Sequence, residues 1–136
     1  MMRILVVNCN TSADVTHTID VGARAAASSG TEIVTVQPTW GPASAEGYLE
    51  SFITAAAVID VISRQKDFDA VVMAGYGEHG REGVRQLVDV PVVDVTEASA
   101  YVASLLSERF AVVTTVASTI PCLLYTSDAA DDSLRV

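Results

Sequence analysis

Short apolar runs alternate with longer helix-like stretches along this 136-residue chain. The runs occupy residues 4–7, 31–36, 70–74, 91–95 and 110–113, and each contains valine or isoleucine. Continuous apolar runs such as 4–7 and 70–74 are typical of strands that are buried on both faces of a parallel sheet, and residues 31–36 are rich in the β-branched residues that strands favour. The stretches between them suit helices that return the chain to the same end of the sheet. The sequence therefore predicts an α/β fold: a doubly wound, mostly parallel five-stranded sheet with helices on both faces.

The third run passes directly into a glycine-rich turn. Gly75, Gly77 and Gly80 follow it, with Glu78 and His79 between the last two glycines. Glycines after a central strand let the backbone turn sharply and approach a ligand closely. Ligands of open α/β sheets bind at the carboxyl ends of the strands. We therefore expect this turn to form part of the functional site.

Three further loops are expected at the same edge of the sheet. They span residues 8–12, 38–44 and 114–115 and contribute amides, hydroxyls and backbone N–H groups. Such donors suit a carboxylate, an imide or a similar small polar anion. Ser44 is expected to cap the second helix, and Thr96 is expected to cap the helix after the fourth strand.

Composition restricts the class of partner. The net charge of −9 and the sequence pI near 4.4 argue against nucleic acid and anionic membranes. No apolar run approaches the roughly 18 residues that a membrane span needs, and no signal peptide is recognisable. Cys9 and Cys122 do not make a disulfide framework, so a cytoplasmic protein with reduced thiols is expected. His17 and His79 lack the spacing of paired metal ligands, so no metal site is expected.

Four motifs resemble those of the hydantoin/allantoin racemases, within the aspartate/glutamate/hydantoin racemase superfamily. Residues 8–12, Asn-Cys-Asn-Thr-Ser, resemble the family turn Asn-Pro-Asn-Thr, and residues 41–47, Gly-Pro-Ala-Ser-Ala-Glu-Gly, resemble its Gly-Pro-Ala-Ser-Ile-Glu segment. Residues 75–80, Gly-Tyr-Gly-Glu-His-Gly, stand where the family has Cys-Phe-Gly-Asp-Pro-Gly. Residues 112–115, Val-Val-Thr-Thr, resemble the strand and turn before its fifth helix. The resemblance covers about residues 2–121, in order and at compatible spacing.

The resemblance implies a racemase, an isomerase that acts without a cofactor on an amino-acid derivative such as a hydantoin or allantoin. Such an enzyme removes a proton from a carbon beside a carbonyl and returns one on the opposite face, with one thiolate as base and one thiol as acid. Polar donors stabilise the enolate-like intermediate. The resemblance also implies a small-molecule substrate and a homo-oligomer. It suggests these substrate-binding residues: Asn10, Thr11, Ser44, Gly75, Gly77 and Thr115.

The sequence departs from the family pattern at the proton carriers. Gly75 occupies the position of the first catalytic cysteine, and the second belongs to a half of the family fold that this chain does not contain. Glu78, His79 and Cys9 are therefore the candidates for catalytic acid and base. Each also has a structural alternative. Glu78 and His79 could stand at the N-terminus of a helix, where the helix dipole favours the charge of Glu78 and His79 is solvated. Cys9 could be a small cysteine at a buried edge of the sheet.

The chain is expected to divide near residue 121. Residues 1–121 are predicted to form the amino-terminal α/β domain of a racemase-like protein, truncated and inactive by itself. Residues 122–136 begin with Cys-Leu-Leu-Tyr-Thr-Ser and resemble a translated sequencing adapter, so we expect a non-native tail.

Two other functions stay open at this point. A non-catalytic domain that binds a small molecule could have kept the racemase scaffold after losing its thiol, as Gly75 suggests. A flavodoxin-like module is the second alternative, because residues 10–12 at a helix start could hold a phosphate.

Overall fold

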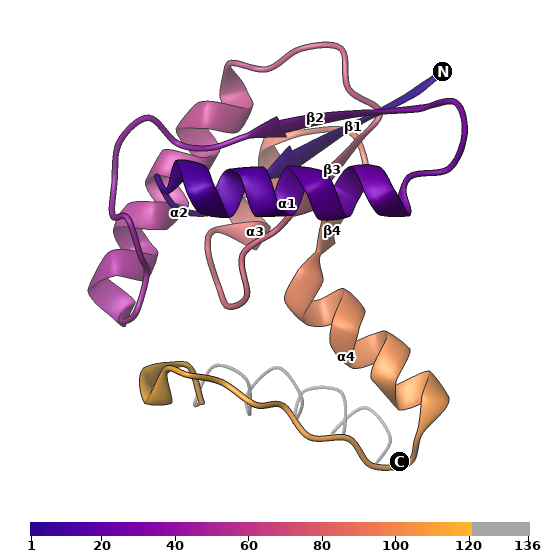
Figure 1. Cartoon of the computed structure of the whole chain (residues 1–136). Coiled ribbons are helices and arrows are strands. Elements are labelled where there is room, and N and C mark those ends of the chain that lie inside the picture. Colours follow the sequence, from indigo (N-terminus) through magenta and orange to yellow (C-terminus); the bar gives the residue numbers. More distant parts are fainter. Residues whose placement is uncertain (121–136) are drawn as a thin grey trace.

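The structure of the chain, a computed structural model, describes residues 1–120. Strands and helices alternate along these residues (Figure 1). The elements are β1 (Met2–Val7), α1 (Ala13–Ala26), β2 (Thr31–Val36), α2 (Tyr48–Ser63), β3 (Ala70–Met73), α3 (Arg81–Leu87), β4 (Val92–Asp94), α4 (Val95–Leu106) and the short 3₁₀ helix η1 (Ala117–Thr119). The predicted non-native tail, residues 122–136, lies outside the described residues.

The strands form a parallel sheet in the order β2-β1-β3-β4. Leu5 of β1 stands at the centre, opposite Val34 on one side and Val71 on the other. The chain moves outward in one direction to β2 and in the other to β3 and β4, so right-handed crossovers place the helices on opposite faces. In Figure 1, α1 lies in front of the sheet and α3 lies behind it. The predicted doubly wound α/β fold is confirmed.

The fifth strand expected at residues 110–113 is not formed; the sheet of the described chain has four strands. Figure 1 shows α4 pointing away from the sheet, so the segment that follows it does not return to the free edge of β4. Val113 is accordingly 94% exposed. An apolar run becomes a strand only where a neighbouring strand can accept and donate its backbone hydrogen bonds, and this segment has none.

The apolar core lies between the sheet and the α2–α3 pair. Its buried cluster comprises Leu5, Val7, Val58, Val61, Ile62, Val71, Met73 and Val84. By contrast, α1 has no fully buried residue. The core therefore secures the central strands, β1 and β3, and with them the position of the loops at their carboxyl ends.

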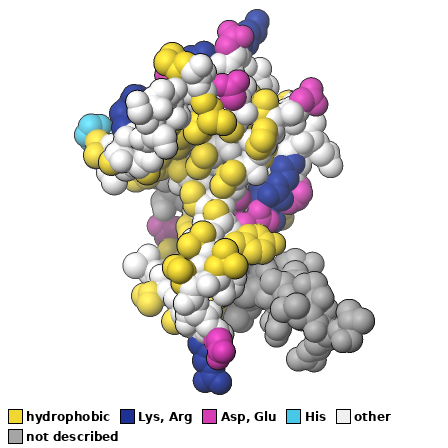
Figure 2. Space-filling view, turned by 90° about the vertical axis from the view of Figure 1, so that its right-hand side faces the viewer, with side chains coloured by type: hydrophobic (Ala, Val, Ile, Leu, Met, Phe, Trp, Pro, Cys, Tyr) yellow, Lys and Arg dark blue, Asp and Glu magenta, His cyan; other side chains and the backbone are white. Residues whose placement is uncertain are grey.

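A large apolar surface remains exposed over α4. Leu105 and Leu106 are 85% and 81% exposed, and Tyr101 and Val102 on the same helix are also exposed. Figure 2 shows apolar side chains gathered over the lower part of this face, where α4 lies. Within residues 1–120, no helix combines the length and apolarity needed to cross a membrane.

Candidate active site

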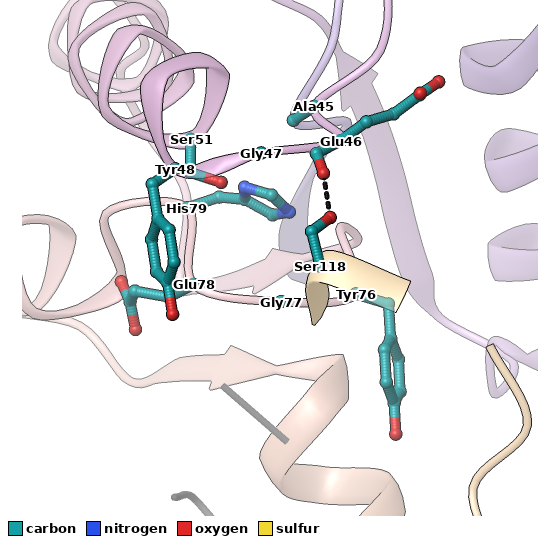
Figure 3. Close-up of a pocket in the computed structure, with 10 residues that line it drawn as sticks. All are labelled: Ala45, Glu46, Gly47, Tyr48, Ser51, Tyr76, Gly77, Glu78, His79 and Ser118. Carbon is teal, nitrogen blue, oxygen red and sulfur yellow. Dashed lines mark hydrogen bonds between the residues drawn. The ribbon is translucent and has the colours of Figure 1, made fainter. Parts of the chain in front are cut away.

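A small pocket lies at the carboxyl edge of the sheet (Figure 3). Residues 45–48, Ser51 of α2, residues 76–79 and Ser118 line it. Its volume is about 20 Å³, which is room for about one water molecule. The strand order reverses between β1 and β3, and ligands of open α/β sheets bind at such a switch point. The pocket thus lies at the edge predicted from the sequence.

Ser118 of η1 lines this pocket. Its hydroxyl donates a hydrogen bond to the carbonyl of Glu46, a residue far away in sequence (Figure 3). The contact therefore joins η1 to the segment before α2 beside the pocket.

The loop after β1 is held in shape by Asn8, which is 1% exposed. Its amide nitrogen lies within 3.2 Å of three acceptors, which are Asn10 Oδ1, the carbonyl of Ser12 and Thr16 Oγ1. Asn10 Oδ1 also accepts from the backbone N–H of Ser12 at 2.9 Å. Asn10 is one of the predicted substrate-binding residues, and its side-chain oxygen is used inside the turn.

Thr11 joins the loop after β1 to the loop after β2. Its backbone N–H donates to the carbonyl of Pro42 at 3.2 Å, and its carbonyl accepts from Gln37 Nε2 at 2.9 Å. The two loops therefore lie side by side at one edge, as predicted.

The prediction that Ser44 caps α2 is wrong. Gly47 is the N-cap residue, and α2 begins at Tyr48. Ser44 is exposed, and its hydroxyl bonds to Glu46 Oε1 at 3.1 Å. A serine that lies four residues before the first helical residue meets this nearer acceptor within the turn before it can reach the helix.

Gly75 is the most crowded point of the site. A Cβ placed on it would lie 2.3 Å from Cys9 Sγ and 2.8 Å from His79 Cδ2, closer than real Cβ atoms approach other atoms. Cys9, after β1, and His79, in the turn after β3, therefore converge on the space that a side chain at position 75 would occupy. The structure brings together two of the three predicted catalytic residues.

Gly77 is tied to the helix that follows β4. Its backbone N–H donates to Thr96 Oγ1 at 2.9 Å. The expectation that Thr96 caps α4 is wrong, because Asp94 is the N-cap: its Oδ1 accepts from the backbone N–H groups of Thr96 and Glu97 at 2.8 and 3.2 Å. β4 ends at Asp94, so the carboxylate already stands at the first turn of the helix.

Sequence reasoning did not predict that Asp94 and Thr96, which are buried and joined by a hydrogen bond, belong to the site. Asp94 is fully buried near Cys9 and His79, and its charge acts on both. A single acidic residue at the end of an apolar run, on the edge where the other loops meet, was the signal that could have pointed to it.

Glu78 caps α3. Its Oε1 accepts from the backbone N–H groups of Gly80 and Arg81 at 2.9 and 3.0 Å, and its carboxylate forms a 3.3 Å ion pair with Arg81. Figure 3 shows the Glu78 carboxylate directed away from the imidazole of His79. The geometry therefore agrees with the structural alternative for Glu78, a carboxylate favoured at the N-terminus of a helix.

His79 is only 5% exposed, so the alternative that leaves its side chain in solvent is wrong. Figure 3 shows its ring between Ser51 and Ser118. Its Nδ1 is buried and has no hydrogen-bond partner among the described residues. Burial lowers the pKa of His79 below 6.5, against the opposing effects of a hydrogen bond to the Tyr76 backbone and of the Asp94 and Glu78 charges. The imidazole is therefore neutral at pH 7.

The thiol of Cys9 is protonated at neutral pH. Burial raises its pKa to about 11, and the negative charge of Asp94 acts in the same direction, while hydrogen bonding to the backbone opposes both. Cys9 is the free cysteine of the described chain. Residues 1–120 contain no group of three or more His, Cys, Asp or Glu side chains that could hold a metal ion.

Thr115 does not line the pocket and is exposed. The prediction that Thr115 lies at this edge depended on a fifth strand at residues 110–113. Because that strand is not formed, residues 114–115 do not follow a strand of the sheet. Ser118, three residues further along the chain, lines the pocket instead.

Fold and site together define a parallel α/β domain with a small pocket at its switch point. The family model of Asp/Glu/Hydantoin racemase matches residues 4–131. The chain therefore belongs to the aspartate/glutamate/hydantoin racemase family, and the resemblance inferred from its motifs is confirmed.

Named relatives and solved structures agree with this assignment. The chain is 42% identical to a hydantoin racemase of Pseudomonas sp. (strain NS671), and the match covers 83% of this chain and 46% of the relative. It is 34% identical to a hydantoin racemase of Paenarthrobacter aurescens, and that match covers 82% of this chain and 49% of the relative. The crystal structure of allantoin racemase from Pseudomonas fluorescens is similar with a TM-score of 0.90 and 52% identity, over 96% of this chain and 56% of that one. Allantoin racemase from Klebsiella pneumoniae has a TM-score of 0.92 and 35% identity, over 96% and 54%. The chain thus spans about half the length of the relatives it matches.

Proposed function

We propose that this protein racemises a small cyclic ureide, a 5-substituted hydantoin or allantoin, without a cofactor. The observation that carries the proposal is the likeness to allantoin racemase at 52% identity over 96% of the chain. Both substrate types have a ring carbon that bears hydrogen beside a carbonyl. Removal of that hydrogen as a proton gives an enolate-like ion, and its return on the opposite face inverts the stereocentre.

The pocket offers groups suited to such a ring. The neutral imidazole of His79 can donate to a carbonyl oxygen on which negative charge develops, without placing a second charge in a buried site. Gly75 and Gly77 allow close approach to the backbone. We propose that the remaining polar contacts come from Asn10, Thr11 and Ser44 in the neighbouring loops and from Ser118.

A binding protein without catalysis is the second candidate, and Gly75 favours it because glycine carries no transferable proton. The flavodoxin-like alternative has lost its support, since the chain belongs to the racemase family. We further propose that the protein acts in the cytoplasm as a homo-oligomer, in keeping with the apolar surface exposed on α4.

Proton–deuterium exchange at the ring stereocentre tests the proposed function. Single enantiomers of allantoin and of 5-substituted hydantoins are incubated with the protein in D₂O and followed by NMR and polarimetry. The assay is run on the 136-residue chain, on residues 1–121 alone, which are predicted to be inactive, and on any longer reading frame that contains the chain. Exchange above the protein-free rate supports a racemase. Saturable binding without exchange identifies the non-catalytic alternative.

A further inference from the structure

A second and larger pocket lies at the edge of the sheet opposite the candidate active site. The ends of α2 and α3 and the segments that lead into β3 and β4 form it, and residues 62–63, 65–68 and 87–90 line it. Because these segments precede β3 and β4, the pocket lies at the amino ends of the two strands. Its volume is about 490 Å³, which falls within the roughly 300–1,000 Å³ that is usual for sites of small organic molecules. None of its lining residues belongs to the candidate active site.

Several walls of this pocket are apolar and rest on the core. Ile62 belongs to the buried core cluster, and Phe68, Val88 and Val90 are partly buried against that cluster. Leu87, at the end of α3, lines the same pocket and is exposed. Apolar surface that remains in contact with water inside a pocket favours a ligand with an apolar body, since binding removes that surface from water.

The turn that borders the pocket is held in shape by β1. Arg3 Nη1 donates to the carbonyls of Lys66 and Asp67 at 3.4 and 3.1 Å. The backbone N–H of Arg3 also donates to Asp69 Oδ2, at 2.7 Å. In Figure 1 this turn, which joins α2 to β3, lies at the end of the sheet where β1 begins. The wall is therefore formed before a ligand binds, so binding does not have to order it.

Negative charge outweighs positive charge around the pocket. The carboxylates of Asp67 and Asp89 line it, and neither takes part in an ion pair within residues 1–120. The sixteen-residue helix α2 ends there without a basic residue in its last turn, and the carbonyls at a helix end add partial negative charge. Lys66 is the one cationic side chain of the lining, and Arg64, which follows α2, is paired with Asp60. The pocket is thus complementary to a cation.

We propose that this pocket binds a small organic ammonium ion, which is a primary amine with an apolar aliphatic or aromatic body. The ammonium group pairs with the exposed carboxylates of Asp67 and Asp89, and the apolar body covers Phe68 and Leu87. The net charge of −9 attracts cations to the molecule as a whole and adds to this preference. Binding at this edge is independent of the racemase activity proposed for the other edge.

Titration of the isotope-labelled 136-residue chain, followed by the NMR shifts of its backbone amides, tests the proposal. Phenethylammonium is the probe, while phenethyl alcohol and hydrocinnamate are a neutral and an anionic molecule of similar shape. The ammonium probe is expected to shift amides of residues 62–68 and 87–90 saturably and to bind about fivefold more tightly than the alcohol. Added salt should weaken its binding, because the charges are exposed. Hydrocinnamate should shift none of these amides.

Two sets of substitutions have opposite expected effects on the affinity for phenethylammonium. Asp67→Asn with Asp89→Asn should lower it about fivefold, and asparagine tolerates the φ of 60° at position 67 as aspartate does. Lys66→Gln removes the competing cation and should raise the affinity about twofold. Asp14→Asn with Glu108→Gln removes two exposed charges elsewhere and is the matched control, for which the affinity should stay as it was.

Each result supports or overturns the ammonium site. It is overturned if the probe causes no saturable shifts at residues 62–68 and 87–90, or if the alcohol or the anion binds equally well. A double variant at Asp67 and Asp89 that keeps the affinity of the unchanged protein would overturn it too. Amides outside the pocket that keep their positions show that this variant is folded. Proton–deuterium exchange at the substrate stereocentre is measured separately, so failure here leaves the racemase proposal standing.

Discussion

The backbone N–H of Gly77 donates to the hydroxyl of Thr96 over 2.9 Å and thereby joins the glycine turn to the first turn of α4. The backbone N–H of Thr96 in turn donates to the buried carboxylate of Asp94. The end of β4, the start of α4 and the turn that carries His79 are thus one hydrogen-bonded unit. Its integrity decides whether the pocket keeps its shape.

Thr96→Val is expected to lower the free energy of unfolding by about 1–3 kcal/mol, because it leaves the N–H of Gly77 without its acceptor. Urea denaturation followed by circular dichroism measures the change. Thr18→Val, on the exposed side of α1, is the control and should stay within about 0.5 kcal/mol. Equal effects of the two substitutions would contradict a structural role for the Gly77–Thr96 bond.

Gly75→Ala is expected to destabilise the fold by about 1–3 kcal/mol, because the new Cβ would overlap Cys9 Sγ. Combination with Cys9→Gly should cost less than the sum of the two single changes, which a double-mutant cycle detects. Gly22→Ala is the matched control. It lies inside α1 with no atom within 4 Å of the new Cβ, so it should stabilise the protein by about 0.5–1 kcal/mol.

Acid should weaken the fold through His79. Burial lowers its pKa below 6.5, so the unfolded chain binds the proton more readily than the folded chain. Stability is therefore expected to fall as the pH drops below 6.5, and His79→Gln should flatten that part of the pH–stability curve. His17→Gln, on the exposed surface of α1, should leave the slope as it was.

Alkali should weaken the fold through Cys9, with the opposite sign. Its pKa rises from 9.0 to about 11 on folding, so the folded chain holds the proton more tightly. The stabilisation is complete below pH 9 and is lost as the pH rises toward 11. Denaturation at pH 8 to 11, compared between the unchanged protein and Cys9→Ala, measures this effect; parallel curves for the two proteins would refute it.

The apolar surface of α4 should cause self-association of the 136-residue chain. Leu105 and Leu106 expose most of their side chains, and patches of this kind associate in water. Light scattering is expected to show a mass that grows with concentration and that falls after substitution of both leucines by serine. Val21→Ser, on the exposed side of α1, is the control. A monomer at high concentration in the unchanged chain would contradict the prediction.

The site shows where sequence reasoning reached its limit. The motifs placed Cys9, Gly75 and His79 at one edge, because parallel strands bring their carboxyl ends together. They did not show that the three residues touch, that His79 is buried, or that Glu78 is engaged at the start of α3. Those facts depend on how far the loop after β1 extends toward the turn after β3, and no local pattern encodes that distance.

The sequence by itself determined the alternation of elements, the parallel sheet and the family, because apolar runs and turn residues are local signals that survive without knowledge of the packing. Tertiary structure alone decided the rest. The apolar run at 110–113 is strand-like in composition but forms no strand, because α4 carries it away from the sheet and a strand needs a partner. Likewise, the pKa values of Cys9 and His79 follow from their burial, and burial is set by elements that are remote in sequence.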